Sequence, residues 1–180
     1  MSRRPVAVAN RHPRLHLDRR AVARAVRVLD QNSAILAPSG SGLPGAGEIS
    51  VAFLTDEALA ALHSEFLDDP APTDVITFSF PRPSALEPAG EICISADAAL
   101  RQAAGRPGGT RAFSAELALY LVHGWLHLAG HDDRTPAARK AMRRAEARAL
   151  GLLRAAGALP TFAFNRLLKQ KVRAVRGTLR

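Results

Sequence analysis

The stretch Leu117-Ala-Leu-Tyr-Leu-Val-His123-Gly-Trp-Leu-His127-Leu-Ala-Gly130-His-Asp-Asp133 decides how this chain folds. It belongs to an apolar segment, about residues 111–129, whose length and composition predict a long, largely buried helix. Gly130 can adopt the left-handed backbone conformation that ends a helix and turns the chain back. The sequence therefore predicts a central helix followed by a polar His-Asp-Asp turn that folds back beside it.

Two histidines, His123 and His127, fall on one face of this predicted helix. They are four residues apart, a spacing that stacks two side chains about one turn apart and lets both bind one metal ion. The following turn offers a third ligand from His131, Asp132 or Asp133. Three protein ligands leave a fourth position for water, as in catalytic zinc sites. The stretch therefore predicts a hydrolytic metal site with one ion per chain, and zinc is preferred because imidazole and carboxylate suit it.

The same residues can be compared with zinc proteases. His123, His127, Gly130 and Asp133 match the spacing of the metzincin string H-E-x-x-H-x-x-G-x-x-H. Gly124 replaces the Glu that acts as general base in peptide hydrolysis, so a metallopeptidase is the less favoured alternative. Attack on a phosphodiester needs less help from such a base, because a metal ion can lower a water pKa from about 15.7 to about 7 and neutralise phosphate charge. No catalytic group beyond the metal-bound water is predicted.

Elements predicted around the metal helix define the fold class. Alternating and β-branched runs predict strands, and apolar periodicity after the capping residues Asp18, Ser95 and Thr135 predicts helices. They indicate an α+β (α/β-like) single domain, with a mixed sheet of about four strands packed with four to five helices. Residues 1–151 form the predicted hydrolase domain and residues 152–180 a basic C-terminal extension. The predicted strands are residues 5–9, 48–54, 73–80 and 90–95, and the other helices are residues 19–29, 55–66, 96–104 and 136–151.

The positive charge of the chain is concentrated at its C-terminal end. The 180 residues carry a net charge of +9. Up to Glu146 there are 17 Lys and Arg against 16 Asp and Glu, and after it there are eight basic residues and no acid. Such asymmetry predicts attraction to a polyanion, most simply nucleic acid, with a solvated tail that aids solubility as the alternative.

Apolar residues recur at near-helical spacing within this tail, which predicts a basic amphipathic helix; they are Leu167, Leu168, Val172 and Val175. Such a helix suits a phosphate backbone or an anionic membrane surface, and RNA is favoured because the metal site predicts a phosphodiester substrate. The predicted RNA contacts are Arg166, Lys169, Lys171, Arg173 and Arg176.

Cysteine content and hydropathy indicate the compartment. The single cysteine, Cys93, excludes an internal disulfide framework and fits a reducing cytoplasm. Its apolar neighbours predict a buried side chain. The longest apolar run, residues 117–122, is far shorter than the ~20 residues that a membrane helix needs. The N-terminus has no apolar signal region. The sequence therefore predicts a cytoplasmic protein without membrane segments.

Three blocks of the chain resemble the YbeY family of bacterial rRNA maturation factors. The stretch from His123 to Asp133 resembles the family string H-G-x-L-H-L-x-G-Y-D-H. Residues 70–78 resemble D-x-P-T-D-V-L-S-F-P, and Gly90-Glu-Ile-Cys-Ile94 resembles G-D-I-x-I. The resemblance covers about residues 45–150. It implies a single-strand-specific, zinc-dependent endoribonuclease that acts in rRNA maturation, at the small-subunit rRNA 3′ end, and in ribosome quality control. It also implies the ribosomal small subunit or its assembly factors as partners.

Two positions depart from the family pattern. The family's third metal ligand is usually His, and the aligned residue is Asp133, while His131 stands where the family has Tyr. The register of the string favours Asp133 as the ligand, with His131 as the alternative. Leu67 occupies the place of an Arg implicated in activity. This second departure keeps open another function, a non-catalytic RNA-binding metalloprotein of ribosome assembly.

Overall fold

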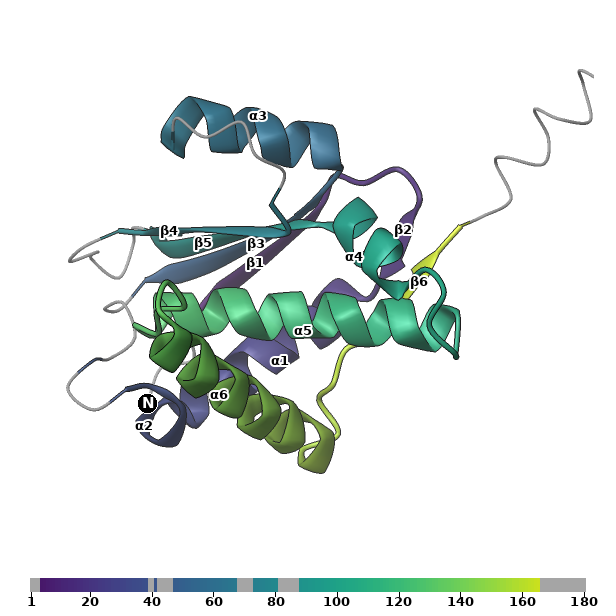
Figure 1. The fold of residues 1–180 in the computed structure, drawn as a ribbon. Coiled ribbons are helices and arrows are strands. Elements are labelled where there is room, and N and C mark those ends of the chain that lie inside the picture. The colour runs from purple at the N-terminus through teal and green to yellow at the C-terminus, as the bar shows by residue number, and fades with distance from the viewer. Residues whose placement is uncertain (1–3, 39–40, 42–46, 68–72, 81–87, 166–180) are drawn as a thin grey trace, which may run out of the picture.

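The computed structural model describes residues 4–38, 41, 47–67, 73–80 and 88–165. Its main sheet has four strands in the order β1-β3-β5-β4. Strands β1 (Val6–Asn10), β3 (Glu48–Leu54) and β5 (Pro88–Ser95) run parallel, and β4 (Val75–Ser79) pairs antiparallel with β5 (Figure 1). The predicted mixed, four-stranded sheet is therefore confirmed.

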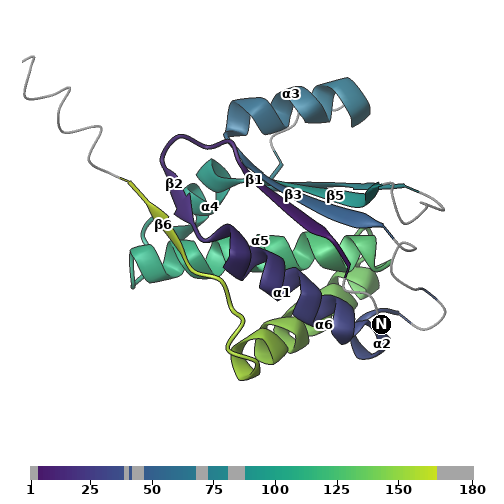
Figure 2. The ribbon, with the colours of Figure 1, turned by 180° about the vertical axis from the view of Figure 1, so that it is seen from behind.

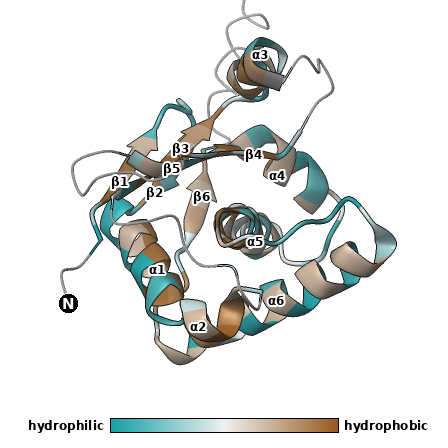
Figure 3. Ribbon diagram, turned by 90° about the vertical axis from the view of Figure 1, so that its left-hand side faces the viewer, coloured by the Kyte–Doolittle hydropathy of each residue, from teal (hydrophilic) through white to brown (hydrophobic). Residues whose placement is uncertain are grey.

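Helices cover both faces of this sheet. Helix α5 (Thr110–Leu128) lies against one face, and α1 (Arg19–Gln31) and α6 (Pro136–Ala155) pack around it, while α3 (Asp56–Leu67) lies on the opposite face (Figures 2 and 3). Helix α4 (Ala96–Ala103) follows β5 and packs beside α5. The predicted α+β fold is confirmed, with six helices in the described residues because a short helix, α2 (Ser33–Leu36), was not predicted.

The predicted capping residues set where the helices begin. Asp18, Ser95 and Thr135 each accept a hydrogen bond from a backbone N–H of the first turn, at 2.8, 3.0 and 3.1 Å. These bonds satisfy N–H groups that have no partner inside the helix. The far ends were predicted less well, since α6 continues to Ala155 rather than ending near Gly151.

Helix α5 forms the centre of the hydrophobic core. Leu117, Leu121 and Trp125 have no exposed surface. The Trp125 indole N–H donates a hydrogen bond of 2.8 Å to the Asp30 carboxylate, which also pairs with the Arg4 guanidinium at 3.1 Å. Burial raises the pKa of Asp30, although these two partners oppose the shift. The polar end of Trp125 is thus satisfied inside the core, as burial of an indole requires.

A second, two-stranded sheet joins the two ends of the described chain. Strand β2 (Leu15–Leu17) pairs antiparallel with β6 (Phe162–Phe164). Phe162 is buried, and its ring centroid lies 5.4 Å from that of Phe53 in β3. The first part of the predicted basic extension therefore packs against the domain. Residues 166–180, which hold the predicted RNA contacts, lie outside the described residues. No helix in the described part of the chain has the length and hydropathy to cross a membrane.

Candidate metal centre

The end of α5 and the turn after it bring three side chains together. The Nε2 atoms of His123 and His127 lie 2.9 Å apart. The Asp133 Oδ2 atom is 3.7 Å from the first nitrogen and 3.9 Å from the second. One ligand atom from each of the three residues lies within 4.8 Å of the other two, so the group could hold one metal ion. Gly130 permits this arrangement, because its φ of 95° reverses the chain after the helix.

The outer nitrogens of both histidines are held by acceptors. The Glu146 carboxylate accepts from His123 Nδ1 at 2.8 Å, and the His131 backbone carbonyl accepts from His127 Nδ1 at 3.1 Å. A carboxylate and a carbonyl can only accept, so Nδ1 carries the proton in each ring. Two neutral rings then direct the lone pairs of Nε2 toward each other.

With Nδ1 protonated in both rings, the two Nε2 atoms are free to bind a metal ion. Two lone pairs that face each other across 2.9 Å repel unless a cation or a proton lies between them. The Asp133 carboxylate adds a negative charge on the same side. Two imidazoles with one carboxylate are a ligand set that would suit zinc. The donor set therefore fits a divalent ion.

The pKa values of the two histidines are shifted in opposite directions. Burial lowers the pKa of His123, but the hydrogen bond and charge of Glu146, with the charges of Asp74 and Asp133, outweigh it and raise the pKa overall. Burial and the neighbouring His123 lower the pKa of His127. His127 is therefore the ring that stays neutral to lower pH, as a metal ligand must be.

His131 and Asp132 are directed to other partners. The His131 Nε2 atom bonds the Leu36 carbonyl at 2.7 Å, and its own carbonyl is the group that holds His127. The Asp132 carboxylate pairs with the exposed Arg134. Of the three candidates in this turn, Asp133 is the one whose side chain lies beside the histidines. That Asp133 completes the metal site remains a prediction that this geometry supports.

Gly124 lies where α5 packs tightly against the sheet. A Cβ atom added there would come within 2.4 Å of Ile92 Cγ2 and 3.1 Å of Val75 Cγ1. Position 124 thus faces the sheet, and a glutamate side chain has no room at the place where zinc proteases carry their general base. The close packing of α5 on the sheet is therefore a structural reason, beside the missing Glu, against a peptidase.

Glu146 is a residue of the candidate site that sequence reasoning did not identify. It lies 23 residues from His123 and on another helix, so no local spacing connects the two. Its one distinguishing feature in the sequence is that it is the only acid in α6. Asp74, just before β4, was likewise missed, and its charge acts on His123.

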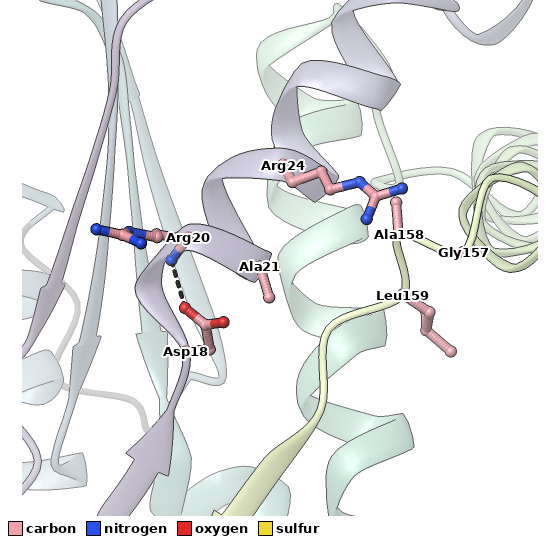
Figure 4. Close-up of a pocket in the computed structure, with 7 residues that line it drawn as sticks. All are labelled: Asp18, Arg20, Ala21, Arg24, Gly157, Ala158 and Leu159. Carbon is pink, nitrogen blue, oxygen red and sulfur yellow. Dashed lines mark hydrogen bonds between the residues drawn. The ribbon is translucent and has the colours of Figure 1, made fainter.

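Of two pockets on the described surface, one shares a charged residue with the surroundings of this centre and the other lies apart from it. One, of about 290 Å³, lies between α4, α5 and the residues just before β4, and its lining includes Asp74, Arg101 and Tyr120. The charge of Asp74 also acts on His123. The other, of about 250 Å³, lies between α1 and the turn after α6 (Figure 4) and includes none of the metal-site residues. Its charged groups have structural roles, since Asp18 caps α1 and Arg24 donates to the Ala156 carbonyl at 3.0 Å.

Fold and site together define a mixed-sheet α+β protein with a His-His-Asp group, suited to a divalent ion, at the end of its central helix. The family model for Endoribonuclease YbeY matches residues 8–154. The chain belongs to this family, as its three sequence blocks predicted.

Two relatives found by sequence agree with this assignment. Endoribonuclease YbeY of Chlamydia abortus is 44% identical over 115 residues, which is 62% of this chain and 73% of the relative. Endoribonuclease YbeY of an Anaeromyxobacter species is 38% identical over 155 residues, 84% of this chain and 74% of the relative. The solution structure of a Thermotoga maritima protein is 17% identical, with a TM-score of 0.47 over 85% of this chain and 94% of that one.

Proposed function

We propose that this protein is a metal-dependent endoribonuclease that hydrolyses single-stranded RNA during rRNA maturation in the cytoplasm. The observation that carries the proposal is the pair of Nε2 atoms 2.9 Å apart with Asp133 beside them, in a member of a family named for this activity. The maturation of the small-subunit rRNA 3′ end and ribosome quality control are the corresponding processes. The small subunit or its assembly factors are the corresponding partners.

Within this proposal, His123, His127 and Asp133 hold one ion, and zinc is the leading candidate for a set of two imidazoles and a carboxylate. When bound there, the ion would supply Lewis-acid activation of water and neutralise charge on the phosphodiester. Glu146 fixes the ring of His123, and the His131 carbonyl fixes that of His127, so that both Nε2 atoms face the same point. No side chain is assigned as general base.

The absence of a base at position 124 favours a phosphodiester over a peptide. Peptide hydrolysis at such a site uses a Glu directly after the first His. Gly124 has no side chain, and the sheet leaves no space for one. A phosphodiester carries a charge that the ion itself neutralises, so the reaction depends less on that residue.

A second candidate is a non-catalytic RNA-binding metalloprotein of ribosome assembly. Leu67, at the place where an Arg implicated in activity is common, is the observation that favours it. An apolar side chain there cannot contact phosphate as a guanidinium does. In that case the same residues hold the metal, and RNA is bound without being cleaved.

One set of assays tests both candidates. The protein, purified without chelator, is analysed for metal and incubated with end-labelled single-stranded RNA, with and without EDTA. We expect near-stoichiometric zinc and cleavage that EDTA stops. The variant His123→Ala/His127→Ala should lose both. Bound metal without RNA cleavage would favour the assembly role, and cleavage that persists in the double variant would place the nuclease site elsewhere. Casein digestion would reveal a peptidase.

A further inference from the structure

Helix α6 presents a basic face to solvent. Met142, Ala145, Ala149 and Leu153 are buried on one side of the helix. At about 100° per residue, five of the six Lys and Arg residues of the helix fall on the half of the circumference opposite these four, and Arg139 lies at the edge of that half. All six of these basic side chains are exposed. We call this surface the α6 basic face, and its members are Arg139, Lys140, Arg143, Arg144, Arg148 and Arg154.

Most of the charge on this face is available to a ligand. The one carboxylate of α6, Glu146, bonds His123 and forms no ion pair with these six residues. Arg139 donates to the Asp133 and Arg134 carbonyls at 3.2 and 3.0 Å, and Arg148 donates to the Ile35 carbonyl at 3.0 Å. The side chains of the other four, Lys140, Arg143, Arg144 and Arg154, make no hydrogen bond or ion pair with the residues that the structure describes.

The α6 basic face begins beside the candidate metal centre. Glu146 contacts His123 at 2.8 Å. Arg143 and Arg139 precede Glu146 by three and seven residues, so they lie one and two turns away along the same strip of the helix. Figure 3 shows α6 packed beside α5, the helix that carries both histidines. A strand bound along α6 would therefore pass the metal centre at this edge.

We propose that the α6 basic face binds the phosphate backbone of single-stranded RNA next to the position that is cleaved. This inference rests on the proposed nuclease function and names a surface for its substrate. The helix has 20 residues, which at about 1.5 Å per residue gives a length of about 30 Å, enough to follow several phosphates. Contacts from Lys and Arg to phosphate carry no sequence preference, so the face positions the strand without reading its bases.

The structure argues against a membrane as the occupant. A helix that binds a membrane surface inserts an apolar face among the lipids. The apolar face of α6 is already buried in the core. The exposed large hydrophobic residues of the described chain are Ile35, Phe66 and Phe80, and none belongs to α6. A charged face without exposed apolar side chains suits a hydrophilic polyanion.

The test measures RNA binding without cleavage, on the full-length chain. The triple variant Lys140→Gln/Arg143→Gln/Arg144→Gln is compared with a control that removes the same charge from the α1 region, Arg11→Gln/Arg19→Gln/Arg20→Gln, whose three arginines are also exposed. The probe is a fluorescein-labelled single-stranded RNA of about twelve nucleotides, in the range that one binding groove covers. Fluorescence anisotropy in EDTA gives Kd over a series of salt concentrations.

If all three cations contact phosphates, the slope of log affinity against log salt becomes shallower by about two, at about 0.7 per contact. If both proteins bind equally at about 1 M salt, the variant then binds about 100-fold more weakly at about 0.1 M. The control should keep the slope of the unaltered protein. To separate the contribution of α6 from that of the C-terminal tail, the α6 variant and the control are also made in a full-length protein whose tail cations are changed to Gln. These cations are Arg166, Lys169, Lys171, Arg173, Arg176 and Arg180.

Each outcome decides the proposal. Loss confined to the α6 triple variant, in both backgrounds, supports it. An unchanged slope in that variant, or an equal loss in the control, overturns it. Loss of binding to anionic phospholipid vesicles with unchanged RNA binding would reassign the face to a membrane and also overturn it. The anisotropy assay measures binding without turnover, so it is independent of the cleavage assay. If the protein binds RNA through α6 but cleaves no RNA, the nuclease function is refuted and RNA binding by the α6 basic face is still supported.

Discussion

The substitution Glu146→Gln should weaken metal binding without unfolding the protein. Glu146 accepts the Nδ1 proton of His123 at 2.8 Å, and its side chain is only 16% exposed. Gln keeps the size and one acceptor oxygen but removes the charge, and a charged acceptor is about twice as strong as a neutral one. Loss of such an outer partner typically lowers metal affinity about 10- to 100-fold, or about 1.4–2.7 kcal/mol. Because Gln can still accept the proton, we expect a value near the lower end.

Competition between the protein and a chromophoric zinc chelator measures this affinity. The control is Glu116→Gln, which makes the same chemical change in another carboxylate of low exposure, one that pairs with Arg106 at 2.7 Å instead of a histidine. Thermal unfolding of both variants shows whether a weaker affinity reflects lost structure. The reasoning would be refuted by a Glu146→Gln variant that binds zinc as tightly as the unaltered protein, or by an equal loss in the control.

Three further results are expected. Asp133→Ala should reduce zinc content far more than His131→Ala, because the His131 ring bonds the Leu36 carbonyl; the opposite ranking would make His131 the ligand. Gly124→Ala should destabilise the fold by about 1–3 kcal/mol in denaturant unfolding, as overpacking does, since its Cβ would meet Ile92 at 2.4 Å; an unchanged midpoint would contradict the close packing of α5 on the sheet. Burial raises the pKa of the Cys93 thiol to about 12, so thiol reagents near pH 8 should label it only after denaturation; rapid labelling of the native protein would show that Cys93 is accessible. The protein should also lose stability as the pH rises above the ordinary thiol pKa of about 8.5, because the thiol then ionises in the unfolded chain but not in the native protein.

Local sequence was sufficient for the features that depend on neighbouring residues. The four-residue spacing of His123 and His127 determines that a helix places them on one face, whatever surrounds it. Gly130 and the capping residues Asp18 and Thr135 act within one turn of where they stand, and the structure has them as predicted. The strands of the main sheet were also predicted, because β-branched and apolar residues are concentrated in them.

Tertiary structure decided what depends on residues that are far apart in the chain. Strands β2 and β6 have three residues each, too few to show a hydrophobic pattern. They form because the fold brings together two segments that are far apart in the sequence. The Leu36 carbonyl accepts from the His131 ring at 2.7 Å across 95 residues of sequence, and this contact favours Asp133 as the predicted third ligand. Glu146 reaches His123 because α6 packs on α5. Sequence spacing specifies the candidate ligand pair, His123 and His127. Packing of the helices supplies the acceptor that orients His123, because the free energy of burying the apolar faces of α5 and α6 determines which polar groups meet at their edge.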